Sequence, residues 1–118
     1  MSQPEAQPER REMLRRQFAK HGRPEQFEKI LVCRKGHALL WLIPTDRGLA
    51  PIANLVGKGR FAARSLDDPQ GPLMTLDQWP PGELLPRASC ECHDSVETSL
   101  HEAKRWLGTS RRKFVYAG

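Results

Sequence analysis

The sequence predicts a small α+β fold, in which an antiparallel sheet carries a C-terminal helix packed on it and follows a basic N-terminal helix. Three observations predict this fold. Residues 38–43 form an uninterrupted apolar run of strand length, bounded by turn residues. Residues 95–107 carry apolar side chains at helical spacing. All three cysteines lie in two short runs that also contain histidine, at 33–37 and 90–93.

Length and composition indicate one small domain with much loop. The chain has 118 residues, of which 38% are hydrophobic, and it contains ten prolines and nine glycines. Three cysteines cannot all pair, which favours a reducing compartment. The first residues lack the apolar run of a signal peptide, and no run approaches the roughly 18 apolar residues that span a bilayer. We therefore expect a cytoplasmic protein with no membrane segment.

The net charge of +5 is concentrated at the two ends of the chain. Residues 1–23 carry six basic and three acidic side chains, and residues 24–103 carry eight basic and eleven acidic ones. The last fifteen residues carry five basic side chains and no acidic one. This pattern suits contact with phosphates or with an acidic protein surface, although solvated termini also tolerate charge.

We divide the chain into a basic N-terminal tail or helix at 1–23 and a domain at 24–118. Helix-forming residues run from 9 to 20, between Pro8 as a start signal and Gly22 as a stop signal. The apolar face of this predicted helix is thin, with Leu14 and Phe18 one turn apart. We expect the helix either to dock on the domain or to become ordered on a partner.

The sheet is predicted between residues 27 and 66. One strand leads into Cys33, a second covers 38–43, and Thr45–Gly48 has the composition of a hairpin turn. Residues 49–56 return as the partner strand, with Pro51 tolerated only near an edge. The run 57–60 (Gly-Lys-Gly-Arg) lacks the spacing of a P-loop, so we interpret it as a turn and not as an anion site. A short strand at 61–66 would follow.

A proline-rich insert is predicted at 67–86. It has no clear periodicity, yet its apolar residues, including Trp79, are too many for a free linker. We expect it to cover one face of the sheet, and the alternative is a surface that binds a partner.

The C-terminal helix has the clearest periodicity. Val96, Leu100, Ala103 and Leu107 recur at helical spacing, and Gly108 follows as a C-cap. Asp94 and Glu97 have the form of a capping box, which predicts a helix over 95–107. Residues 114–116 are predicted to form a final short strand that joins an edge of the sheet.

The cysteine and histidine runs predict a metal site. Zinc prefers four thiolate or imidazole ligands in a tetrahedron, delivered as two close pairs. We expect Cys33, His37, Cys90 and Cys92 to be the ligands, because His93 and Cys92 would point in opposite directions in an extended backbone. His93 remains an alternative ligand in place of Cys92 or His37. Free buried cysteines clustered by chance are the competing interpretation.

A set of four protein ligands predicts a structural Zn²⁺ ion, because a catalytic site keeps one position open for water. The chain has no H-E-x-x-H motif, no deaminase motif and no nucleophile elbow. We therefore expect no enzyme and no small-molecule substrate.

The segment 31–39 (Leu-Val-Cys-Arg-Lys-Gly-His-Ala-Leu) resembles the first zinc knuckle of small uncharacterised zinc-ribbon-like proteins from high-GC Gram-positive bacteria and their phages. In those proteins a similar Cys-Arg-x-Gly-His turn precedes an apolar strand and, later, a Cys-x-Cys pair. The resemblance covers residues 30–56 and 88–116. It implies a zinc-ribbon-like, β-rich module that holds a metal, and the group has no assigned activity that could be carried over.

These observations favour a regulatory protein that binds zinc and either nucleic acid or a nucleic-acid machine such as RNA polymerase. The side chains expected to contact phosphate are those of Arg11, Arg15, Arg16, Arg111, Arg112 and Lys113. The alternative is a small regulator or phage accessory protein that docks through its N-terminal helix or the loop around Trp79. A zinc enzyme would require a site with only three protein ligands.

Overall fold

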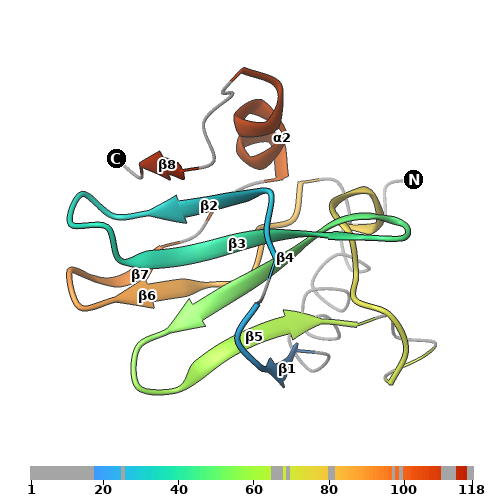
Figure 1. Cartoon of the computed structure of the whole chain (residues 1–118), viewed down its shortest axis with the longest axis horizontal. Coiled ribbons are helices and arrows are strands. Elements are labelled where there is room, and N and C mark those ends of the chain that lie inside the picture. The colour runs from blue at the N-terminus through green and yellow to red at the C-terminus, as the bar shows by residue number, and fades with distance from the viewer. Residues whose placement is uncertain are drawn as a thin grey trace, which may run out of the picture.

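The structure, a computed structural model, describes residues 18–24, 26–64, 68, 70–79, 82–96, 98, 100–109 and 114–116. Within them it is an α+β fold built on one large sheet and a separate hairpin (Figure 1). The strands are β1 (Phe18–His21), β2 (Lys29–Val32), β3 (Ala38–Thr45), β4 (Gly48–Leu55), β5 (Gly59–Ala63), β6 (Ala88–Cys90), β7 (His93–Val96) and β8 (Phe114–Tyr116). The helices are the 3-10 turn η1 (Leu76–Gln78) and α2 (Leu100–Thr109).

Strands β2 to β5 form an antiparallel meander, as the sequence predicts. The turn between β3 and β4 closes because Thr45 Oγ1 donates a hydrogen bond to the carbonyl oxygen of Gly48 over 2.7 Å. The turn between β4 and β5 has Gly57 at positive φ (74°), so the first half of the run 57–60 is a turn as predicted, while Gly59 and Arg60 already belong to β5. Pro51 lies in an internal strand, but β4 pairs with β5 only from Ile52, so Pro51 is just outside that ladder.

The prediction of a helix that reaches residue 20 is wrong at its C-terminal end. Residues 18–21 form strand β1, which pairs antiparallel with β5 from Phe18 opposite Ala63 to His21 opposite Arg60. The physical reason is tertiary: the ring of Phe18 packs 6.2 Å from that of Trp79, and the edge of β5 offers backbone hydrogen bonds. The rest of the predicted helix, residues 9–17, lies outside the described residues.

The six-stranded sheet has the order β1-β5-β4-β3-β2-β8, and it is buried on both faces. Successive residues of a strand point to opposite faces of the sheet, so neighbours such as Leu40 and Trp41 join different apolar clusters. The larger cluster includes Leu31, Leu39, Leu40, Leu42 and Ala53, and the smaller one Ile30, Val32, Trp41, Ile52 and Ala62.

The insert covers the face of the sheet that carries the larger cluster, as expected. Met74, Leu76, Trp79 and Leu85 are buried in that cluster. Trp79 is only 2% exposed, and its indole N–H donates a 3.0 Å hydrogen bond to the carbonyl oxygen of Leu84. The proline-rich segment is therefore part of the core, and its aromatic ring is not at the surface.

The predicted start of the C-terminal helix is wrong. Residues 93–96 form β7, which pairs with β6 through Cys90 opposite His93 and Ala88 opposite Val96. Asp94 therefore lies in a strand and does not cap a helix. Helix α2 begins at Leu100 and extends through Gly108 to Thr109, and its Leu100 and Ala103 side chains pack into the larger cluster.

The final strand joins the edge of the sheet, as predicted. β8 pairs with β2 in parallel, with Ile30 opposite Phe114 and Val32 opposite Tyr116. It thereby covers the edge of β2, the strand that leads into the first pair of candidate ligands.

Candidate metal centre

The first pair of ligands lies on the tight turn between β2 and β3. Cys33 follows the last residue of β2, and its N–H donates to the carbonyl oxygen of His37 over 3.0 Å. The N–H of Gly36 donates to the carbonyl oxygen of Cys33 over 2.8 Å, and Gly36 has a φ of 86°. A glycine is favoured at that position because side chains disfavour this backbone conformation. The turn brings the side chains of Cys33 and His37 together.

The second pair lies on the turn between β6 and β7. Cys90 ends β6, and the N–H of Cys92 donates to the Sγ of Cys90 over 3.3 Å. Both pairs of candidate ligands therefore lie on hairpin turns. The side chain of His93, the alternative ligand, lies outside the described residues.

Asn54 and Ser89 fix the second hairpin against the main sheet. The Nδ2 of Asn54 on β4 donates to the carbonyl oxygens of Ala38 on β3 and Ser89 on β6, each over 3.2 Å. The Oγ of Ser89 accepts a 2.9 Å hydrogen bond from the N–H of Val56. These bonds hold the turn of β6 and β7 beside the turn of β2 and β3, at one end of the molecule (Figure 1).

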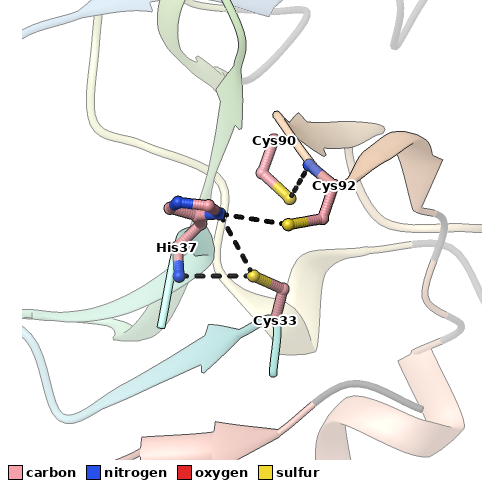
Figure 2. Close-up of side chains that lie close together, drawn as sticks. All are labelled: Cys33, His37, Cys90 and Cys92. Carbon is pink, nitrogen blue, oxygen red and sulfur yellow. Dashed lines mark hydrogen bonds between the residues drawn. The ribbon is translucent and has the colours of Figure 1, made fainter. Parts of the chain in front are cut away.

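The two turns bring four candidate ligand atoms together (Figure 2). The Sγ atoms of Cys33, Cys90 and Cys92 and a ring nitrogen of His37 all lie within 4.8 Å of one another. The Nδ1 of His37 is 3.3 Å from the Sγ of Cys33 and 3.5 Å from that of Cys92. A tetrahedron with Zn–N bonds of about 2.0 Å and Zn–S bonds of about 2.3 Å has N···S edges of about 3.5 Å. The four residues expected from the sequence thus lie close enough to bind a metal ion, with spacing that fits zinc.

Burial differs among the four side chains. Cys33 and Cys90 are buried, His37 is partly buried and Cys92 is exposed. Burial alone would raise the pKa of the Cys33 thiol. Hydrogen bonds from the backbone of His37 and Lys35 and from the other two thiols outweigh burial and lower this pKa to about 7. The Cys92 residue is exposed, but the loss of water around its Sγ, and then the hydrogen bond and negative charge shared with Cys33, raise the pKa of its thiol.

These pKa values predict how many protons the ion displaces. At pH 7 we expect about half a proton to leave Cys33 and about one to leave Cys92, because zinc binds thiolates. Zinc affinity should therefore rise with pH. By about pH 8 zinc binding should release almost no proton from Cys33, because that thiol is then already ionised. Calorimetric zinc titrations in two buffers of different ionisation enthalpy measure the proton count. A proton count that does not fall between pH 7 and pH 8 would contradict a Cys33 pKa near 7.

One group of residues beside this centre was not predicted from the sequence. Arg60 on β5 lies with its guanidinium carbon 5.1 Å from the centre of the Trp41 ring on β3. Together with Asn54 they line a groove whose wall also includes His37 and Cys90. The pairing of Asn54 opposite Arg60 brings these residues together, and no sequence motif encodes that register.

The residues expected to contact phosphate, Arg11, Arg15, Arg16, Arg111, Arg112 and Lys113, lie outside the part of the chain that the structure describes. Among the described residues, no helix is long and apolar enough to cross a membrane. No protein-family model, curated protein or solved structure matches the chain.

Proposed function

We propose that this chain is a non-enzymatic zinc protein that binds nucleic acid, or a nucleic-acid machine such as RNA polymerase. The observation that carries the zinc assignment is the convergence of four protein ligand atoms from two hairpin turns. Four protein ligands fill a tetrahedral site and leave no position for a reactive water, so the ion has a structural role. It joins the hairpin of β6 and β7 to the main sheet.

The nucleic-acid partner is supported by the distribution of charge. Both ends of the sequence are basic, and exposed cations also occur close to the metal centre: Arg34 and Lys35 on the first ligand turn and Lys58 on the turn between β4 and β5. Phosphate contacts by such side chains displace counterions, so affinity that falls steeply with salt is the signature of this binding mode.

The test combines zinc content with salt-dependent binding. The purified protein should contain about one zinc ion per chain and bind labelled single-stranded or duplex oligonucleotides in fluorescence anisotropy. Replacing Arg111, Arg112 and Lys113 together by glutamine should reduce the slope of log K against log salt by about two to three units. The same replacement of Arg11, Arg15 and Arg16 tests the other end of the chain.

The matched control removes the same charge from exposed positions elsewhere, with glutamine at Arg47, Arg87 and Lys104. This control should change the slope much less than the terminal variants do. Equal slopes in all variants would refute binding through the termini, and the absence of binding to every nucleic acid would refute the proposed partner.

The alternative of a regulator that docks through Trp79 loses support, because that ring is buried beneath the sheet. Docking through the N-terminal segment remains a prediction. A partner that stays bound in high salt would favour it over a nucleic acid.

A further inference from the structure

The groove beside the metal centre has a volume of about 440 Å³. Its lining includes Cys90 and Glu91 of the second hairpin, together with Trp41, Asn54 and Arg60 of the sheet. This volume lies within the range of about 300–1,000 Å³ that is typical of small-ligand sites. The lining also draws on three hairpin turns, those of β2–β3, β4–β5 and β6–β7, which lie on the same side of the molecule (Figure 1).

Arg60 is the unusual residue of this groove. Its side chain is partly buried, its guanidinium group lies over the Trp41 ring, and its Nε is buried without a hydrogen-bond partner. Among the described residues, no acidic side chain forms an ion pair with it. Partial burial of a cation is costly unless an anion or hydrogen-bond acceptors compensate for the lost water. The geometry therefore favours an anionic ligand at Arg60.

The charges around the groove favour the same kind of ligand. Lys58 is exposed on the adjacent turn, and Lys20 lies against Gly59, since a Cβ added there would be 3.3 Å from its Cε. Lys35 is close enough to Cys92 to lower its pKa through its charge. Glu91 and a zinc ion held by three thiolates each contribute one negative charge. The cations outnumber these negative charges.

Asn54 and Arg60 also offer the contacts that a flat, polar ring would use. Because both carbonyl partners of Asn54 are bound by its Nδ2, the amide orientation is fixed and its Oδ1 remains as an acceptor. The guanidinium carbon of Arg60 lies over the Trp41 ring, and nucleobases stack on guanidinium groups and aromatic rings in single-stranded complexes.

We propose that this groove binds one nucleotide unit of a single-stranded nucleic acid, with phosphate at Arg60 and the base beside the Arg60–Trp41 stack. This inference rests on the proposed nucleic-acid function and assigns a site to it. His37 and Cys90 are both candidate zinc ligands and wall residues, so the ion holds the groove in shape. Binding at this site therefore requires zinc, although the ion does not contact the nucleotide.

The test compares Arg60→Gln with Arg47→Gln. Both variants remove one positive charge, but Arg47 is exposed on the turn between β3 and β4, at the opposite end of the molecule from the groove (Figure 1). Arg60→Gln should weaken binding of a labelled single-stranded oligonucleotide about tenfold or more, the effect of losing a charge-assisted contact. Arg47→Gln should change affinity by less than about twofold. Zinc content and melting temperature verify that both variants are folded. Arg60→Lys keeps the charge but not the planar guanidinium group, and it should weaken binding less than Arg60→Gln.

Nuclear magnetic resonance distinguishes a nucleotide unit of a single strand from a free nucleotide and from duplex DNA. The side-chain N–H signals of Trp41 and Asn54 should shift when the oligonucleotide is added to the zinc-loaded wild type, and not in Arg60→Gln. Arg60-dependent shifts with free adenosine monophosphate but none with the oligonucleotide would overturn the assignment to single strands. Shifts with duplex DNA as large as those with single strands would also overturn it.

Different binding results would refute the groove proposal and the proposed function. If Arg60→Gln binds as tightly as the wild type while the terminal glutamine variants lose binding, the groove proposal is wrong and the nucleic-acid function stands. If the wild type binds no oligonucleotide and adenosine monophosphate causes no shift, the groove proposal and direct binding to nucleic acid are both wrong. Unchanged binding after zinc removal from a chain that stays folded would refute the role of the ion in shaping the groove.

Discussion

Replacing Cys92 by alanine is expected to release the metal ion and to destabilise the whole fold. A structural zinc ion contributes about 10–16 kcal/mol at pH 7, whereas domains of this size are stable by about 5–15 kcal/mol in total. Cys92 is exposed, so its truncation leaves no cavity, and any large loss of stability reports the missing metal bond. Zinc content by mass spectrometry and thermal unfolding by circular dichroism measure the two effects.

The adjacent residue provides a control for this prediction. Glu91 is exposed on the same turn, and Glu91→Ala should retain both zinc and melting temperature. Treatment of the wild type with a strong chelator should reproduce the unfolding of Cys92→Ala. A Cys92→Ala protein that keeps its zinc would show that another residue, such as His93, completes the site, and wild-type stability without zinc would contradict a structural ion.

Replacing Trp79 by alanine is expected to destabilise the fold by about 3–5 kcal/mol, the usual cost of truncating a buried aromatic side chain. Trp79 is 2% exposed, contacts the ring of Phe18 and bonds the carbonyl oxygen of Leu84. The substitution removes all three contributions at once and leaves that carbonyl without its indole partner. Chemical denaturation of the zinc-loaded protein gives the free energy of unfolding.

Two further variants separate packing from binding. Trp79→Phe keeps much of the apolar volume and loses the hydrogen bond, so it should cost less than Trp79→Ala. Leu84 in the same segment is 45% exposed, and Leu84→Ala should change stability by less than about 0.5 kcal/mol. A Trp79→Ala protein of wild-type stability that fails to bind its partner would restore the alternative in which this loop is a docking surface.

The first ligand turn and the central strands were predictable because their signals are local. Gly36 between Cys33 and His37 marks a tight turn, and the apolar run that becomes β3 begins directly after it. The grouping of four ligands was predictable for a different reason. Zinc imposes a chemical requirement on residue types, and the chain contains only three cysteines to meet it.

The two ends of the chain were less predictable, because tertiary pairing decides their structure. Residues 18–20 continue a helix-forming composition, yet the open edge of β5 recruits them as a strand. Asp94 and Glu97 have the pattern of a capping box, but Val96 pairs with Ala88 across the second hairpin. The contact of Arg60 with Trp41 depends on the register of β3, β4 and β5, which composition does not reveal.

The placement of the four ligands on two hairpins has a consequence for the order of folding. Each pair forms within a few residues of its own turn, so either half of the site can assemble early and independently. Only the meeting of the halves requires closure of the segment 38–89, at an entropic cost of about 3.5 kcal/mol plus a constant. That segment contains β3, β4, β5 and the covering insert. Binding of the ion by both halves is therefore a late step in folding. Completion of the core then depends on the supply of metal.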